Sequence, residues 1–419
     1  MPHTPQTAVV RLLQGCTEAR NIAPGERVEV RPHLLILGPR DGLAALKAYL
    51  LAGGEEIPEP DRVILFSEDN LPAPDAAAAN RRKQLNEAAA QAGIRRVIPA
   101  AGCELAHVLE QALVVPGELA VANLPEVHRL GGIGALGMRV TTRDLAALLA
   151  GKPLSLTVPA AVRVDLTGQR QALVSGRDVF FTLRRELTRD RLVGRALEIG
   201  GEGLATLSLD DRTALCGQAA HAGVAAMFCP PDRAAVAELN KRIARPYTTI
   251  EPEKEAAYAH RATMDISHAQ LSVIPPEGVD KWRTVGESSG EPVSRVVISG
   301  GLSALQQALE IIKLRRRNPQ VECLVVPDTR ATYQRALAQD VIEQLIEAGV
   351  QVHQPGTPAA LLLDGKPGLV TGVVAPQGCW RAGVIAAATA ACAGAIVHPE
   401  RLDAQPQRDS KLSGRRPKT

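Results

Sequence analysis

Three side chains in the sequence have the chemistry to move a proton together: Glu126, His128 and His221. A carboxylate and an imidazole that lie side by side can act as a general acid and a general base. The chain contains nine histidines, so chance proximity is easy in a protein of this length. A hydrogen-bonded structural role is therefore the favoured interpretation of each histidine, and a new acid/base set is the alternative.

Two glycine-rich stretches are candidates for anion binding. GGIGALG carries the G-x-G-x-x-G spacing of a dinucleotide-binding turn at Gly132, Gly134 and Gly137. Such a turn directly follows a strand and precedes an acidic side chain by about 20 residues, and neither condition is met here. We therefore expect close-packed backbone. The N–H groups of ISGG, residues 298–301, could hold an anion, but a plain strand-to-helix turn is favoured.

The composition predicts a globular protein with more than one domain. The chain has 419 residues, of which 45% are hydrophobic and 2% aromatic, so aliphatic side chains must build its cores. The 48 basic and 45 acidic side chains leave a net charge of +3, too little to attract nucleic acid or an anionic membrane strongly. The basic clusters at residues 313–317 and 411–419 are interpreted as a solvated helix end and a disordered tail.

The cysteines and the N-terminus predict a soluble, cytoplasmic protein. No C-x-x-C pair occurs, so neither a disulfide framework nor a zinc ribbon is expected, and most thiols should be small buried hydrophobes. The sequence begins without a signal-peptide pattern and has no apolar run of about 18 residues. The seven cysteines are Cys16, Cys103, Cys216, Cys229, Cys323, Cys379 and Cys392.

The order of elements is that of a parallel sheet covered by helices. Short apolar runs alternate with longer helical patterns, which is typical of βαβ units and of an open α/β fold. The predicted strands span residues 62–66, 94–100, 294–301, 322–327 and 350–354, and the predicted helices span residues 75–93, 302–317 and 332–349.

Three further segments depart from this alternation of apolar runs and helical patterns. Residues 154–187 contain β-rich runs broken by glycine and proline, and then a helix. Residues 233–291 are polar and are interpreted as a connection between domains. From residue 403 onward the chain has nothing to bury and is expected to be disordered.

The stretch LEIGGEGLATLSLDDRTALCGQAAHAGVAAMFCPPD, residues 197–232, resembles the large subunits of 3-isopropylmalate dehydratases and their relatives in the aconitase superfamily. The likeness continues in NIAPGERVEVRPHLLILGPRDG, LPAP, GKPLSLTVPAAVRVDLTGQ and AGVIAAATAACAGAIVHPERL. Together these pieces cover the chain from about Thr7 to Leu402.

The resemblance implies an aconitase-like α/β protein with three α/β/α-type domains whose mixed sheets are mainly parallel. We expect these domains at residues 1–128, 129–287 and 288–402, followed by a basic tail at residues 403–419. It also implies a separate small subunit that completes the active site.

In this family a 4Fe-4S cluster held by three thiolates binds the substrate hydroxyl, and the reaction removes water from a hydroxy acid and adds it back elsewhere. The family cysteines match Gly301 in ISGGLSAL and Thr357 and Ala360 in PGTPAAL. All three thiolates are replaced here. We therefore expect no cluster and no other cofactor, with apolar packing where the cluster would lie.

Other catalytic and substrate-binding positions of the family also carry different residues here. Leu105 stands in place of an acid/base histidine and cannot transfer a proton. LPEV at residues 124–127 replaces Asp-Ser-His-Thr, and APQG at residues 375–378 replaces a loop that grips substrate. Glu68 and Asp69 stand at the position of an Asp-His pair.

Arg381 still matches a substrate-binding arginine of the family. A guanidinium there could hold a carboxylate through two hydrogen bonds. A surface or interface arginine is the other interpretation.

The leading hypothesis is a relative of the dehydratase large subunit that has lost the cluster and the dehydratase activity. It would act as a non-catalytic binding or assembly partner of a dehydratase small subunit or of a large-subunit paralogue. The alternative is a cluster-independent enzyme on a small hydroxy or carboxylic acid, with Arg381 as the anchor and Glu68, Asp69, Glu126 or His128 for proton transfer. Neither nucleic acid nor a membrane is an expected partner.

Overall fold

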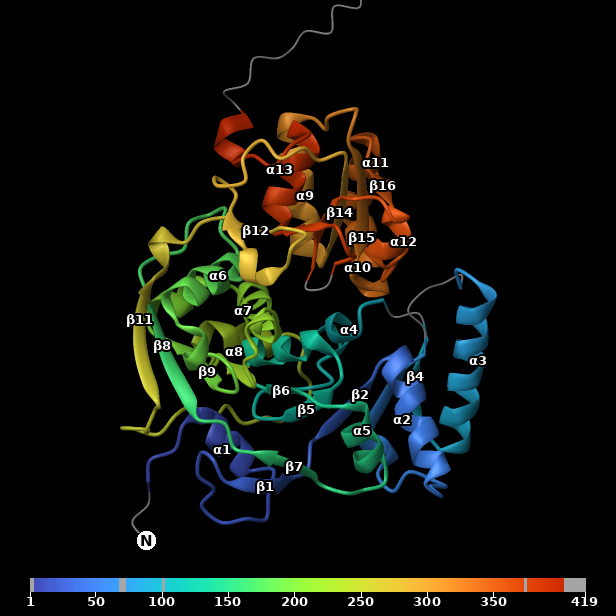
Figure 1. The fold of residues 1–419 in the computed structure, drawn as a ribbon, viewed down its shortest axis with the longest axis vertical. Helices are drawn as coiled ribbons and strands as arrows, with labels where there is room; N and C mark the ends of the chain where they lie inside the picture. The colour runs from blue at the N-terminus through green and yellow to red at the C-terminus, as the bar shows by residue number, and fades with distance from the viewer. Residues whose placement is uncertain (1–3, 68–72, 100–101, 373–374, 403–419) are drawn as a thin grey trace, which may run out of the picture.

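The computed structural model describes residues 4–67, 73–99, 102–372 and 375–402. The chain builds three large sheets and one two-stranded ribbon, with helices packed between and around them (Figure 1). The predicted α/β fold with mixed, mainly parallel sheets is confirmed. Glu68 and Asp69 lie outside the described residues.

The first sheet is five-stranded and wholly parallel, and both of its faces are covered. Alternate residues of β2 point to opposite faces, so Leu35 and Leu37 join one core while Leu34 and Ile36 join another. In sheet order the strands are β4 (Arg96–Ile98), β3 (Val63–Phe66), β2 (Leu34–Leu37), β5 (Leu119–Ala122) and β6 (Leu136–Arg139). The helices are α2 (Pro39–Leu51), α3 (Ala76–Gln91) and α5 (Thr142–Leu149) on one face, and α4 (Glu104–Glu110) and the 3₁₀ segment η2 (Pro125–Ile133) on the other.

The second sheet is four-stranded and parallel, and its core contains two phenylalanines of α6. Its strands in order are β10 (Ala226–Phe228), β9 (Ala196–Gly200), β8 (Ala161–Thr167) and β11 (His260–Asp265), with α6 (Gly176–Glu186), α7 (Leu209–Gly217) and α8 (Arg233–Leu239) in the connections. The edge strand β11 pairs with β8 over its whole length. The interpretation of residues 233–291 as a connection is therefore wrong for β11. Most side chains of this strand are exposed or half-buried and polar, so its sequence resembles that of a loop.

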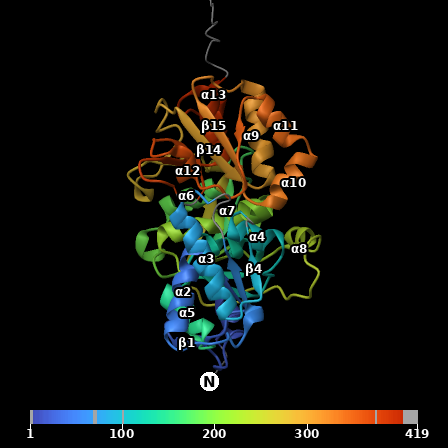
Figure 2. The same cartoon turned by 90° about the vertical axis from the view of Figure 1, so that its right-hand side faces the viewer.

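The third sheet has seven strands, and Figures 1 and 2 show it at the end of the molecule farthest from the N-terminus. Its strands in order are β13 (Arg283–Thr284), β12 (Ser272–Ile274), β18 (Trp380–Ala382), β17 (Leu369–Thr371), β14 (Arg295–Gly300), β15 (Glu322–Pro327) and β16 (Gln351–Val352). All pairs are parallel except the two that β12 makes. Its helices are α9 (Leu302–Arg315), α10 (Arg330–Ala338), α11 (Val341–Glu347) and α13 (Val384–Ala393) on one face, and α12 (Ala359–Leu363) on the other.

The predicted helix over residues 332–349 is wrong in one respect, because the structure has two helices there, α10 and α11. They are separated at Asp340, whose φ of 56° is left-handed. An aspartate tolerates this conformation better than most residues do. The apolar periodicity continues across the break, so the sequence pattern gives no sign of it.

The N-terminal segment lies at the end of the molecule opposite to the third sheet (Figure 1). Helix α1 (Ala8–Gln14) precedes β1 (Arg27–Val30), which pairs antiparallel with β7 (Leu154–Thr157) to form the two-stranded ribbon. No helix among the described residues is long and apolar enough to cross a membrane.

The three sheets suggest where a division into domains would fall. The first sheet ends at Arg139, beyond the expected boundary at residue 128, and the third begins at Ser272. We propose that the three-domain division follows the sheets, with the first boundary just after Arg139. Gly132 allows the first and second sheets' units to pack closely, because a Cβ at this position would lie only 2.4 Å from the backbone nitrogen of Thr213 in α7.

Candidate functional site at the carboxyl edge of the third sheet

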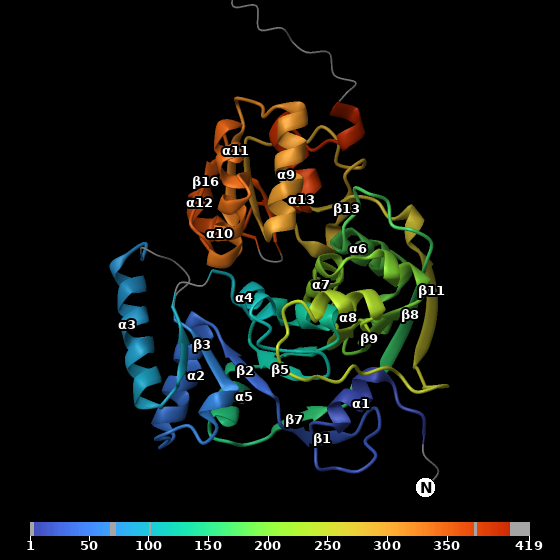
Figure 3. The same cartoon turned by 180° about the vertical axis from the view of Figure 1, so that it is seen from behind.

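The first and third sheets meet at their carboxyl edges, where ligand sites of parallel sheets are commonly found. Asp328 directly follows β15, and Gly102 and Cys103 follow β4 of the first sheet. The Cys103 N–H donates to the Asp328 carbonyl at 2.7 Å, and Gly102 forms a β-bridge with Thr329. Figures 1 and 3 show the result, with α4 lying directly below α10.

Gly102 makes this close approach possible. Its φ is +94°, a conformation that other residues rarely adopt. A Cβ at this position would also lie only 2.2 Å from the Asp328 carbonyl oxygen. The contact between the two units therefore requires glycine here.

A second contact fixes α4 against α10. The Glu110 carboxylate accepts hydrogen bonds from the hydroxyls of Thr329 at 2.5 Å and Thr332 at 2.6 Å, and it forms an ion pair with Arg335. Thr329 is fully buried and Thr332 nearly so. Charge-assisted bonds at buried hydroxyls hold the two elements in one geometry.

Four charged side chains and one thiol gather beside this contact. Glu126 and Arg129 come from η2, Asp210 from the first turn of α7, and Asp328 from the end of β15. The Cys103 thiol donates to Glu126 Oε2 at 3.7 Å. Glu126, Arg129 and Asp328 are partly exposed.

The electrostatics of this group favour a proton on Asp328. Burial raises the pKa of Asp328, Arg129 lowers it, and the nearby carboxylates Glu126, Glu110 and Asp210 raise it, which together leave it at about 6. Burial lowers the pKa of Arg129, but the thiol and the surrounding carboxylates outweigh this and hold it above its ordinary value. A carboxyl group that titrates near pH 6 is suited to proton transfer.

Asp328→Asn is expected to stabilise the protein at alkaline pH. Because the folded-state pKa of Asp328 lies above its ordinary value of 3.8, its stabilising contribution is present below pH 3.8 and is lost as the pH rises through about 6. We expect a gain of about 1–2 kcal/mol in the free energy of unfolding at a pH of about 8, shrinking to nothing near pH ~4. Urea unfolding at both pH values measures it.

Glu87→Gln in α3 is the control, since Glu87 is well exposed and forms a loose surface ion pair with Lys83 at 3.9 Å. This variant should show no such pH-dependent gain. Equal stability of Asp328→Asn and the native protein at both pH values would contradict the account of Asp328.

The residues predicted from the sequence fall in different places. Glu126 lies in the group just described. His128 is only 3% exposed, and burial lowers its pKa to about 4, so its ring is neutral at physiological pH. His221 lies 3.2 Å from Arg381, measured from ring Nε2 to guanidinium Nη1. Their catalytic and binding roles stay predictions.

Arg381 lies at the junction of the second and third sheets. It is in β18, and its carbonyl accepts from Arg177 Nη2 at 3.3 Å. Burial lowers the pKa of Arg177, Asp178 raises it and Arg381 lowers it, which together leave it at about 10. Since β18 is three strand positions from β15, Arg381 is roughly 14 Å from the strand that carries Asp328.

The positions that match the family's cluster ligands do not supply thiolates. A Cβ at Gly301 would point into open space. The Thr357 hydroxyl donates to the Gln354 carbonyl at 2.7 Å, and Ala360 is exposed. These residues do not fit a cluster that needs three thiolates.

The other cysteines do not compensate. Cys323 and Cys379 are buried in two separate cores of the third sheet, and burial raises the pKa of each thiol. Cys216 and Cys229 lie together in the second sheet's core, with their sulfurs 3.6 Å apart. Cys103 is the thiol that lies beside Asp328.

The position of the family's acid/base histidine is closed by packing. Leu105 is 0% exposed and lies in a core with Ile36 and Phe66.

Helix α12, which follows the position of Thr357, packs against the third sheet through Leu363, which contacts the core of Val297 and Val370. At the ligand positions themselves Ala360 is exposed and a Cβ at Gly301 would meet no atom, so the apolar packing expected in place of the cluster is not seen at these two positions.

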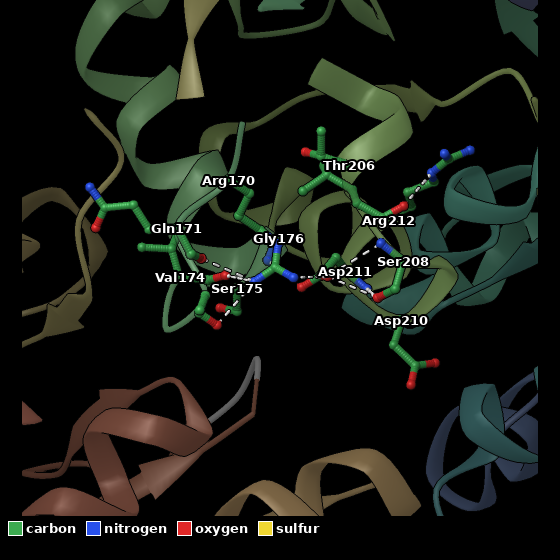
Figure 4. A network of polar contacts seen from close by, with 12 residues as sticks. Arg170, Gln171, Val174, Ser175, Gly176, Thr206, Ser208, Asp210, Asp211 and Arg212 are labelled. Atoms are coloured by element: carbon green, nitrogen blue, oxygen red, sulfur yellow. Dashed lines mark hydrogen bonds and ion pairs between the residues drawn. The ribbon is translucent and has the colours of Figure 1, made fainter. Parts of the chain in front are cut away.

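A polar network holds α7 in place (Figure 4). The Asp211 carboxylate accepts from the Gly176 N–H at 3.0 Å and lies 3.6 Å from Arg170, while Ser208 and Asp211 form a capping box at the start of the helix. This network fixes the first turn of α7 and therefore the placement of Asp210.

Sequence reasoning missed Cys103, Arg129, Asp210 and Asp328. One signal for Asp328 was present, since it directly follows the apolar run ECLVVP, and polar residues at that end of a parallel strand often form sites. The others come from three different elements, and nothing in their spacing predicts that they meet.

Comparison with known families matches more than half of this chain to one family model. Residues 60–291 match the model of the Aconitase family, aconitate hydratase. Among curated proteins, 3-isopropylmalate dehydratase large subunit 2 of Rubrobacter xylanophilus is 27% identical, with 97% of this chain and 100% of that protein covered. The 3-isopropylmalate dehydratase large subunit of Desulfitobacterium hafniense is also 27% identical, with 91% and 96% covered.

Among solved structures, the holo-form of aconitase X from Thermococcus kodakaraensis is similar in fold. Its TM-score is 0.51 at 11% sequence identity, and the match covers 95% of this chain and 96% of that chain. At this identity the likeness concerns the fold alone.

Proposed function

We propose that this chain, a member of the aconitase family, works without the family's iron–sulfur cluster. Its membership is shown by the family model, which matches residues 60–291, more than half of the chain's 419 residues. The chain keeps the scaffold of the large subunit and does not catalyse the cluster-based removal and addition of water. The observation that carries this proposal is the set of residues at the three ligand positions, Gly301, Thr357 and Ala360.

The closed position of Leu105 supports the same proposal. The family chemistry as the resemblance implies it needs a proton-transferring side chain as well as the cluster. Here that position lies within an apolar core. Restoring the reaction would therefore require a change in packing in addition to three new thiolates.

The proposed role is that of a non-catalytic binding or assembly subunit. The similar curated proteins are named as large subunits, and the similarity spans nearly their whole length. A cytoplasmic location is part of the proposal, because seven free cysteines fit a reducing compartment. We expect one stable complex, with a dehydratase small subunit or with a catalytic large subunit of the same organism.

Analytical ultracentrifugation of purified components tests this role. The chain is mixed in turn with the small subunit and with the catalytic large subunit, and a complex of defined stoichiometry is expected in one of the mixtures. The catalytic large subunit mixed with the small subunit is the positive control. If that control assembles and this chain binds neither protein, the assembly role is wrong.

The pKa of Asp328 favours one second function, a cluster-independent enzyme on a small hydroxy or carboxylic acid. Asp328 could transfer a proton near pH 6. The negative charges of Glu126, Asp210 and Asp328 around Arg129, however, repel the carboxylate of an acid unless protons are taken up on binding. Thermal-shift measurements with small hydroxy acids test it: stabilisation that is lost in Asp328→Asn supports the enzyme, and no stabilisation by any acid refutes it.

A further inference from the structure

A pocket of about 1110 Å³ lies at the amino edge of the first sheet, the edge opposite to the one that carries Cys103. Its floor forms where the strands begin. His33 precedes β2, Arg62 precedes β3, Arg96 opens β4, and Glu118 precedes β5. The pocket is therefore separate from the group around Asp328.

The pocket lining is rich in guanidinium groups. It contains two more positive than negative side chains, and no phenyl or indole ring lines it within the described part of the chain. The arginines are Arg27, Arg31, Arg62, Arg96, Arg242 and Arg245, and the carboxylates are Glu18, Glu29, Asp61 and Glu118.

Only part of this positive charge is neutralised by direct contacts. Arg245 forms a two-point ion pair with Glu118. Two looser ion pairs at the rim join Arg62 to Glu59 at 3.5 Å and Arg242 to Glu238 at 3.9 Å. Three other arginines donate to uncharged oxygens, and the Nε of Arg96 is buried without a hydrogen-bond partner in the described structure. Their bonds are Arg27 to Ser155 Oγ at 2.8 Å, Arg31 to the Gly151 carbonyl at 3.2 Å, and Arg96 to the Asp61 carbonyl at 2.5 Å.

The ribbon strand β1 directs its charges to one side. Val28 and Val30 are buried, so the alternate residues Arg27, Glu29 and Arg31 share the exposed face. This face forms one wall of the pocket, and the segment after α8 forms another.

The surroundings of His33 are consistent with a positive field. Its Nδ1 accepts the Leu119 N–H at 3.1 Å, so the ring is neutral with its proton on Nε2. Partial burial lowers the pKa of His33, Glu118 raises it, and the charges of Arg62 and Arg245 lower it.

We propose that this pocket binds a phosphorylated small molecule that carries two or more phosphate groups. Guanidinium groups match phosphate oxygens through paired hydrogen bonds. The volume suits a small molecule rather than a single ion. Among the described lining residues the His33 imidazole is the one aromatic ring, and no phenyl or indole ring offers a broad platform for a nucleobase. Charge is therefore the main basis of recognition. This inference does not depend on the proposed function.

The test is titration calorimetry of the full chain with inorganic pyrophosphate at low ionic strength. We expect one site per chain. Arg31→Gln and Arg62→Gln each remove one guanidinium from the lining and are expected to weaken binding about tenfold. Within the described residues the ion pair of Arg62 is with exposed Glu59 at 3.5 Å, so its replacement should leave folding intact even if Arg31→Gln does not.

Arg81→Gln on the exposed surface of α3 is the matched control and should leave the affinity unchanged. Equal weakening by all three substitutions would show a non-specific charge effect and overturn the proposal. So would absence of pyrophosphate binding, or binding of only long polyphosphate or RNA. Citrate serves as a second probe, and a site that prefers citrate to pyrophosphate is not a phosphate site.

Discussion

Replacing Leu105 by histidine, the family's residue, is expected to destabilise the protein by about 2–4 kcal/mol without restoring activity. Leu105 is 0% exposed and packs with Ile36, Phe66 and Val108. An imidazole there would bury two nitrogens among aliphatic and aromatic side chains that offer no hydrogen bonds, and it would lose the leucine's packing.

The pH dependence of this variant follows from the same burial. The buried imidazole must be neutral, so its folded-state pKa lies below the ordinary value of about 6.5. The loss of stability should therefore grow as the pH falls through about 6.5. Guanidinium unfolding at pH ~8 and pH ~5.5 measures both effects.

Leu105→Met is the matched control, because it keeps the volume and the apolar character of the side chain. It should cost less than about 1.5 kcal/mol. A Leu105→His protein of native stability, with a histidine that titrates normally, would show that this position opens to solvent and that packing does not exclude the family's chemistry.

Removing the carboxylate of Asp232 is expected to cost about 3 kcal/mol. Arg212 is 2% exposed, and its Nη2 donates to Asp232 Oδ2 at 2.5 Å and to the Leu204 carbonyl at 3.0 Å. Asp232→Ala leaves that buried charge without its counter-ion. It also removes the cap of α8, where Oδ1 accepts the Ala235 N–H at 2.8 Å.

Asp232→Asn separates the two effects, since the amide oxygen can still cap α8 while the charge is gone. Chemical denaturation should place it between the native protein and Asp232→Ala. Burial raises the pKa of Asp232, but the Arg212 and Ala235 hydrogen bonds outweigh this and hold it below 3.8, so its stabilising effect is lost only in strong acid. A cost below about 0.5 kcal/mol for Asp232→Ala would mean that the backbone carbonyls alone satisfy Arg212.

This ion pair bears on the candidate site through α7. Arg212 lies in the same helix as Asp210, and the helix packs tightly against η2, which carries Arg129. Loosening α7 is therefore expected to disturb the group around Asp328.

The α/β fold could be predicted because its signals are local. Apolar strands and periodic helices alternate, and the strands β3, β14 and β15 appear where apolar runs were found. The break at Asp340 and the edge strand β11 could not be predicted so easily. A left-handed residue leaves the apolar period unchanged, and an edge strand that exposes one face has the polarity of a loop.

The candidate site was much harder to predict, because it depends on contacts between distant segments. Glu126 was singled out for its carboxylate, but its neighbours Asp328 and Arg129 come together only where the first and third sheets meet. In the sequence, Glu126, His128 and His221 were a possible acid/base set, although a structural role was the favoured interpretation of each histidine. In the structure His128 is buried and its pKa is about 4.

The central claim is that this aconitase-family chain does not carry the family's cluster, and its most direct test is an iron measurement. The protein is purified without oxygen, incubated with ferrous iron, sulfide and reductant, and desalted. A relative that keeps the three cysteines is treated in the same way as a positive control. We predict no stoichiometric iron or acid-labile sulfide and no visible charge-transfer absorbance in this chain. About four iron and four sulfide per chain, with the absorbance of a 4Fe-4S centre, would contradict the account.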